Sequence, residues 1–218
     1  MRHAPADQFQ IILTDPPYGM NAHEFNDSGS ASAGSHFYDD SYAEWQRIMS
    51  VFCPESFRLA APSAHAYVFC DLDRFAELRE RMFAAGWKVH RTPLIWHNPE
   101  GFRVPWPDAG PQRKYELILY AVKGDRRVTT VKGDVLTYSR DKALGHPAQK
   151  PVPLLIDLLA RSARPGDCVF DPFAGSGSTL EAAFEQKLRC VALERDANAF
   201  GIAIKRVKSF EAFEPALF

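Results

Sequence analysis

Residues 168–179 read CVFDPFAGSGST, and the segment after them, 180–187, is rich in helix-forming residues. A strand, a glycine-rich turn and a helix in this order form the half-unit that binds nucleotides in α/β folds. Gly175 and Gly177 let backbone N–H groups approach a ligand closely, and the helix start favours a negatively charged group. A turn that binds nothing would use the same glycines, so this stretch predicts the local fold and leaves the ligand open.

The residues around this turn narrow the class of ligand. The stretch lacks the full G-x-G-x-x-G spacing and no Gly-Lys-Ser/Thr follows it, so neither a dinucleotide nor a nucleoside triphosphate is favoured. The next predicted strand, 189–193, ends at Glu194. An acidic residue about twenty residues after such a turn typically binds ribose hydroxyls. The pairing of the turn with Glu194 therefore favours a ribose without a pyrophosphate.

A second motif, Asp15-Pro16-Pro17-Tyr18, follows an apolar segment, 9–14, that is typical of a buried strand. The Asp15 carboxylate and the Pro16 carbonyl can accept the two N–H bonds of an exocyclic amine, and Tyr18 can stack on the ring that carries it. The two prolines remove backbone donors and stiffen the loop. An ordinary proline turn at a strand end is the alternative interpretation.

With a third segment, HPAQKP at 146–151, these motifs resemble, in this order, the amino-methyltransferases that modify exocyclic amines of DNA bases. Members of that family use S-adenosylmethionine and make N6-methyladenine or N4-methylcytosine. The catalytic motif precedes the cofactor motif, which is similar to the permuted arrangement called the β class. The resemblance runs through most of the chain.

The resemblance implies a role for each matching residue. The implied catalytic residues are Asp15, Pro16, Pro17 and Tyr18. The implied cofactor-binding residues are Lys150, Asp171, Pro172, Phe173, Ala174, Gly175, Ser176, Gly177, Thr179 and Glu194. Hydrogen bonds from the amine to Asp15 and Pro16 would free the nitrogen lone pair for in-line attack on the methyl group, and the carboxylate would stabilise the positive charge that develops. The scheme requires no metal ion.

The alternation of predicted strands and helices favours an α/β fold, a doubly wound Rossmann-like methyltransferase sheet that is mostly parallel with helices on both faces. Helices are expected at 42–59, 72–85 and 154–160, and further strands at 64–70, 87–96 (with a break at Pro93) and 115–122. We expect one domain, 1–218, with a small recognition-type insertion at about 98–142 and a mobile loop at about 19–40. Because ligands bind at strand carboxyl ends, Asp15, Asp171 and Glu194 should share one rim.

DNA contacts are expected from two regions of the sequence. His36 and Tyr38 follow a run of small residues and could fold over an extruded base, which such enzymes flip out of the duplex. Arg103, Arg113 and Lys114 open a stretch, 103–142, with nine basic and five acidic residues. A basic patch of this kind would serve phosphate contacts, and a solvated polar hairpin is the alternative. The duplex is the expected partner, with a homodimer or a partner subunit as a source of added specificity.

Composition limits the class of protein. The net charge is −1 and hydrophobic residues make up 46% of the chain, which fits a globular enzyme rather than a protein that binds DNA over its whole surface. The four cysteines lack C-x-x-C spacing, and no signal peptide or long apolar run is present. The expected setting is the cytoplasm, with a bacterial or phage origin.

Three functions stay open at this level. An adenine-N6 methyltransferase is favoured because Asp15 opens the tetrapeptide, whereas cytosine-N4 members of the family more often have Ser there. An RNA or protein-amide methyltransferase usually has Asn. A non-catalytic nucleic-acid-binding subunit would not need Asp15 or Glu194. The family commonly has a further strand segment upstream of the catalytic motif, and only residues 1–14 precede Asp15. The adenine pocket is therefore expected to be missing or replaced.

Overall fold

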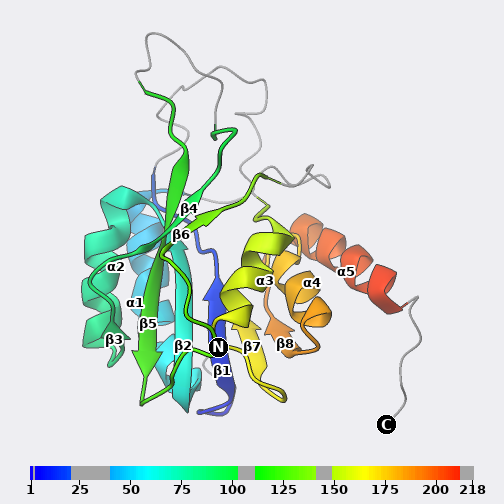
Figure 1. The fold of residues 1–218 in the computed structure, drawn as a ribbon. Helices are drawn as coiled ribbons and strands as arrows, with labels where there is room; N and C mark the ends of the chain where they lie inside the picture. The colour runs from blue at the N-terminus through cyan, green and yellow to red at the C-terminus, as the bar shows by residue number, and fades with distance from the viewer. Residues whose placement is uncertain (2, 21–39, 103–110, 141–148, 212–218) are drawn as a thin grey trace.

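The computed structural model of the chain describes residues 1, 3–20, 40–102, 111–140 and 149–211. These residues form one sheet with helices on both faces (Figure 1). The strands are β1 (Phe9–Thr14), β2 (Ala60–Cys70), β3 (Lys88–Val89), β4 (Leu94–His97), β5 (Tyr115–Lys123), β6 (Val135–Thr137), β7 (Cys168–Asp171) and β8 (Arg189–Ala192). The helices are α1 (Tyr42–Leu59), α2 (Leu72–Ala84), α3 (Val152–Ala160), α4 (Ser178–Glu185) and α5 (Ala197–Glu211).

The strand order is β6-β4-β5-β2-β1-β7-β8, and β3 pairs with β5 beside β4. The chain leaves β1 toward β2 on one side and leaves β7 toward β8 on the other, so the order reverses between β1 and β7. Ligands of doubly wound sheets bind at such a reversal. Strand β5 runs antiparallel to β2, β3 and β4. The amino end of β5 therefore lies at the rim where the parallel strands have their carboxyl ends.

Alternate residues of the strands build a separate core on each face of the sheet, because successive side chains point to opposite faces. Ile12 of β1 packs with residues of α1 and α2, including Trp45 and Met49. Its neighbours Ile11 and Leu13 pack with leucines of α3 and with alanines of α4. All three β1 side chains are fully buried. The predicted doubly wound, mostly parallel architecture is confirmed.

Most predicted elements have their predicted places. Helix α1 has the predicted bounds, and the predicted break at Pro93 separates β3 from β4. Strand β2 begins at Ala60 rather than Ala64, directly after α1. The sequence does not predict α5, because its buried face consists of small residues such as Ala199 and Ala203, while Phe200 and Ile204 are 51% and 39% exposed. The apolar pattern of α5 therefore does not mark the face that packs.

The range predicted as a recognition-type insertion, 98–142, contains two strands of the sheet. Strand β5 pairs with β2 over seven positions, and β6 pairs with β4. The strand expected at 115–122 is β5, so the sheet continues through part of this range. None of the helices in the described ranges combines the length and the hydropathy that a membrane span requires.

Candidate functional site

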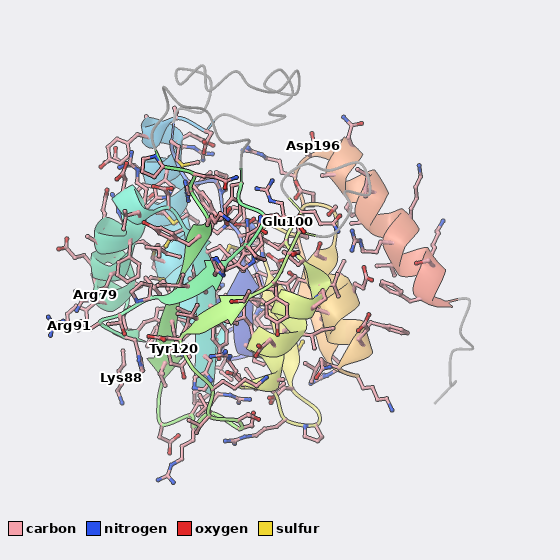
Figure 2. All side chains as sticks on the ribbon, turned by 45° about the horizontal axis from the view of Figure 1, so that its top comes forward. Arg79, Lys88, Arg91, Glu100, Tyr120 and Asp196 are labelled. Carbon is pink, nitrogen blue, oxygen red and sulfur yellow. The ribbon has the colours of Figure 1, made fainter. Side chains whose placement is uncertain are left out.

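A cavity of about 540 Å³ opens at the rim where the strand order reverses. Its walls come from the carboxyl ends of β1, β7 and β8, from α1, and from the segment before α3. Asp15, Asp171 and Glu194 all line it, so the three acidic strand ends share one rim as predicted. Figure 2 shows Asp196, another lining residue, at the start of α5, whereas Arg79, Lys88 and Arg91 point outward on the other side of the molecule.

The first cluster in the site surrounds the carboxylate of Asp15. The Lys150 ammonium lies 2.6 Å from Asp15 Oδ2 and 3.2 Å from Glu116 Oε2. The Tyr18 hydroxyl lies 2.8 Å from Asp15 Oδ1 and 2.9 Å from Glu116 Oε2. Lys150 also lies over the rings of Tyr18, Phe69 and Trp96. Both oxygens of Asp15 are therefore occupied by donors of the protein itself.

The charged groups of this cluster shift one another's pKa values. Burial by itself lowers the pKa of Lys150, but the carboxylates of Asp15 and Glu116 raise it by a larger amount. The net pKa therefore lies above the ordinary value. Burial raises the pKa of Asp15, and the facing Lys150 ammonium opposes that rise. The ammonium is thus charged at neutral pH, and it favours the ionised form of Asp15, although the net pKa of Asp15 stays above its ordinary value.

The second cluster organises the glycine loop. Asp171, at the end of β7, accepts a hydrogen bond of 2.6 Å from the Thr14 hydroxyl of β1 and one of 3.0 Å from the Phe173 N–H. Glu194, after β8, accepts from the Gly175 N–H at 2.8 Å and from the Asp196 N–H at 2.7 Å. The two carboxylates therefore tie the loop to the strands on either side of it.

Gly177 in this loop has a steric reason to be glycine. Its φ is +84°, a conformation that L side chains rarely adopt, and an added Cβ would lie 3.1 Å from the Cβ of Ala203 on α5. Gly175 also has a positive φ, +52°, but an added Cβ there would have open space around it. Gly177 thus serves the close packing of α4 on α5, whereas Gly175 lies at the cavity wall.

The buried carboxyl of Asp171 should make the folding stability depend on pH. Burial raises the pKa of its carboxyl from 3.8 to about 6, although hydrogen bonds from Thr14, Thr179 and Phe173 oppose the rise. Between these values the folded chain holds a proton that the unfolded chain has lost, so stability falls as pH rises from 3.8 to about 6 and then levels off. The full change attributable to Asp171 is about 3 kcal/mol.

Asp171→Asn should remove this contribution, because the amide cannot ionise and its oxygen can still accept hydrogen bonds. Urea unfolding of both proteins at several pH values measures the effect. The stability of Asp171→Asn relative to the original chain should rise from pH 4 to pH 6 and stay constant above. Other titrating groups cancel in the difference, so a difference independent of pH would mean that Asp171 is ionised at pH 4 in the folded protein.

The structure places most of the predicted site residues at the cavity. Those that line it are Asp15, Pro17, Lys150, Asp171, Pro172, Phe173, Ala174, Gly175, Ser176, Thr179 and Glu194. Pro16, Tyr18 and Gly177 lie beside these residues but are not among the described lining residues. Further lining residues that the sequence does not indicate include Ile48, Gln149 and Arg195.

Two residues close to the motifs have structural roles that sequence reasoning missed. Asp40 is buried and accepts hydrogen bonds from the Gly19 N–H at 2.7 Å and the Met20 N–H at 3.3 Å. It thereby fixes the backbone directly after the Asp15–Tyr18 motif. Glu116 is buried near the start of β5 and has only the charge in an otherwise apolar strand as a signal.

The predicted DNA contacts are only partly within the described residues. His36, Tyr38 and Arg103 lie outside them, as do 21–39 of the predicted loop. Arg113 and Lys114 precede β5 at the edge of the sheet where the cavity also opens, and Arg113 pairs there with Asp71 at 2.8 Å while Lys114 donates to the Pro99 carbonyl at 2.7 Å.

Two basic residues farther along this stretch, Lys123 and Arg126, lie away from the cavity. Because β5 is antiparallel, it carries Lys123 and Arg126 to the opposite end of the sheet. Lys123 binds Asp7 there, and the buried Arg126 pairs with Asp167. The prediction of a basic patch over 103–142 is therefore wrong for these residues.

Comparisons with known proteins give a consistent family. A family model described as DNA methylase matches residues 9–205. DNA adenine methyltransferase YhdJ of Escherichia coli (strain K12) is 34% identical over 254 residues, covering 95% of this chain and 79% of that protein. Type II methyltransferase M2.DpnII of Streptococcus pneumoniae is 24% identical over 234 residues, covering 93% of this chain and 84% of that protein.

Solved structures share the fold. The crystal structure of the M1.HpyAVI–SAM complex matches with a TM-score of 0.72 at 20% identity, covering 92% of this chain and 89% of that one. PvuII DNA methyltransferase, described as cytosine-N4-specific, matches with a TM-score of 0.71 at 14% identity, covering 100% of this chain and 83% of that one. At these identities the likeness concerns the architecture alone.

Proposed function

The chain belongs to the DNA methylase family of N6 and N4 amino-methyltransferases, and we propose that it transfers a methyl group from S-adenosylmethionine to the exocyclic N6 amine of adenine in DNA. One observation carries the proposal. The Asp15 carboxylate and the glycine loop from Asp171 to Thr179 line the same cavity. An acceptor for an amine and a loop for a nucleoside-containing cofactor thus meet in one space.

The cavity fits S-adenosylmethionine by its chemistry. Asp15, Asp171 and Glu194 offer carboxylates to a cofactor that carries a sulfonium, an ammonium and two ribose hydroxyls. Ile48 and Phe173 add apolar surface of the kind that contacts a purine ring. A volume of about 540 Å³ falls within the range of small-molecule sites. When bound, the cofactor would supply an electrophilic methyl group.

The residues of the chain perform three tasks in this scheme. Asp15 accepts a hydrogen bond from the target amine and so favours a nitrogen whose lone pair is available. The loop held by Asp171 and Glu194 fixes the position of the cofactor relative to that amine, which accounts for much of the rate. Phe69 and Leu155, both lining residues, exclude water from the place where the two reactants meet.

Adenine is favoured over cytosine by the chain and by a relative. Asp15 opens the tetrapeptide, and the resemblance to the family associates this residue with its adenine-N6 members. The 34% identical relative is named a DNA adenine methyltransferase. Cytosine-N4 methylation is the alternative, since the fold is shared with a cytosine-N4-specific enzyme.

The DNA is proposed to be double-stranded, with the target base extruded into the cavity at a cost of about a few kcal/mol of unstacking. Among the described residues, Arg113 and Lys114 before β5 are proposed to contact phosphates. His36, Tyr38 and Arg103 are proposed as DNA contacts from the sequence alone. A second copy of the chain or a partner subunit would extend this short DNA-contacting surface.

Product analysis tests the function directly. The protein is incubated with S-adenosylmethionine and mixed-sequence duplex DNA, and the digested nucleosides are identified by mass spectrometry. We expect N6-methyldeoxyadenosine. N4-methyldeoxycytidine would establish the alternative, and no methylated base in the presence of measurable cofactor binding would contradict DNA as the substrate of the isolated chain.

A further inference from the structure

In the arrangement that the structure shows, the Asp15 carboxylate is a weakened acceptor for a target amine, because both of its oxygens already face donors of the protein. Its Oδ1 faces the Tyr18 hydroxyl at 2.8 Å and its Oδ2 faces the Lys150 ammonium at 2.6 Å. An incoming N–H group must compete with a hydroxyl and with a full positive charge. Displacing the ammonium would leave a buried cation without a partner, which is costly unless another anion takes it.

Glu116 is placed to be that anion. Its Oε2 lies 3.2 Å from the Lys150 ammonium and 2.9 Å from the Tyr18 hydroxyl, the same two donors that occupy Asp15. The Glu116 side chain is 10% exposed, as is that of Lys150, so water competes little for this contact. Glu116 reaches the rim because β5 is antiparallel and begins there.

The Tyr18 hydroxyl makes the exchange simple. A phenol has one proton to donate, yet this oxygen lies within hydrogen-bond distance of both Asp15 and Glu116. Rotation of the hydroxyl about its C–O bond is enough to move the hydrogen bond from one carboxylate to the other. Lys150 has three donors and already contacts both acids, so a small side-chain shift moves its charge.

On this geometry, and resting on the proposed function, we propose that Glu116 is a positioning residue for methyl transfer. It takes over the Tyr18 hydroxyl and the Lys150 ammonium when the target amine takes their place on Asp15. The two carboxylates and one ammonium thus act as an exchange in which every buried donor keeps an acceptor. Glu116 would contact neither the cofactor nor the transferred methyl group.

The first test compares Glu116→Gln with Glu77→Gln. Glu77 is the matched control, because it also accepts from a tyrosine hydroxyl (Tyr42, 2.8 Å) and pairs with a cation (Arg81, 2.7 Å), but on the surface of α1 and α2. In single turnovers with saturating cofactor, Glu116→Gln should be slower by about 10- to 100-fold, the loss typical of a charged hydrogen-bond partner. Its affinity for S-adenosylmethionine should change by less than about twofold. Equal rates for both variants would overturn the inference.

A second variant separates the exchange from a structural role. Lys150→Met alone and Lys150→Met combined with Glu116→Gln complete a double-mutant cycle, and the double variant should be slowed by less than the product of the two single losses. Single losses that simply multiply would overturn the inference, because independent losses accumulate whereas an exchange couples the two residues. Melting temperatures of both variants check that each remains folded.

A readout without activity keeps this inference separate from the proposed function. The charged or titratable groups that face Asp15 are Lys150, Tyr18, Glu116 and Asp171, and the Glu116 carboxylate raises the pKa of Asp15. Carboxyl NMR titration should therefore show a lower Asp15 pKa in Glu116→Gln and no change in Glu77→Gln. An unchanged Asp15 titration would overturn the inference even in an active enzyme. If the Asp15 pKa falls in Glu116→Gln as expected but the enzyme makes no methylated DNA, the result would count against the proposed function alone.

Discussion

Replacement of Asp15 by alanine is expected to lower the rate of DNA methylation by about 10²- to 10⁴-fold, the range for losing a group that acts on the reacting atoms. The reason is that Asp15 is the carboxylate at the end of β1 that lines the cavity and that is proposed to accept from the amine. Glu116 would still balance Lys150, so the buried ammonium keeps a partner and the fold should survive.

Single-turnover methylation and cofactor titration together measure this prediction. Affinity for S-adenosylmethionine should change by less than about tenfold, because the loop residues and Glu194 remain. Asp73→Ala is a suitable control, since Asp73 is an exposed acid on α2 outside the cavity lining. Asp15→Ala with a rate close to that of the original chain would remove Asp15 from the chemistry and favour a different acceptor.

Replacement of Phe170 by alanine is expected to lower the free energy of unfolding by about 3–5 kcal/mol. Phe170 lies in β7, is 3% exposed, and stacks on Phe9 with ring centroids 4.5 Å apart. Its backbone pairs with Ile12 on one side and Val191 on the other, and the void would open in the core on one face of the sheet. For a chain of this size the melting temperature should fall by about 10 °C.

Urea unfolding checks this value against Phe83→Ala. Phe83 on α2 is 72% exposed, so its loss should cost less than about 1 kcal/mol. Because Asp171 follows Phe170 directly, the variant should also bind S-adenosylmethionine more weakly near its melting transition. Similar stabilities for the two variants would show that β7 does not lie in the core.

Local sequence patterns predicted much of the site because the relevant geometry is local. The turn at Gly175 and Gly177, the strand end at Asp15 and the acid at Glu194 each follow directly from the strand before them. Parallel strands bring their carboxyl ends to one rim whatever the details of packing. The meeting of Asp15, Asp171 and Glu194 could therefore be expected without coordinates, and the cavity lining agrees with it.

Local sequence patterns could not predict the position of Lys150 relative to Asp15. Lys150 was expected at the cofactor, and it lines the cavity, but its ammonium lies between Asp15 and Glu116. The direct contact joins residues 135 positions apart, and no periodic pattern fixes a distance across that separation. The same holds for Asp40, whose carboxylate holds the backbone of Gly19 and Met20.

The sequence by itself determined the doubly wound architecture, the Asp15–Tyr18 strand end, the glycine loop and the family, since these depend on residue types at short spacing. Only the tertiary structure decided the direction of β5. That one reversal carries Lys123 and Arg126 away from the cavity and brings Glu116 to Tyr18 and Lys150. The hydrophobic pattern of a strand does not indicate its direction in the sheet, because the alternation of side chains between the two faces is the same in both directions. Its hydrogen-bonded neighbours alone set its direction.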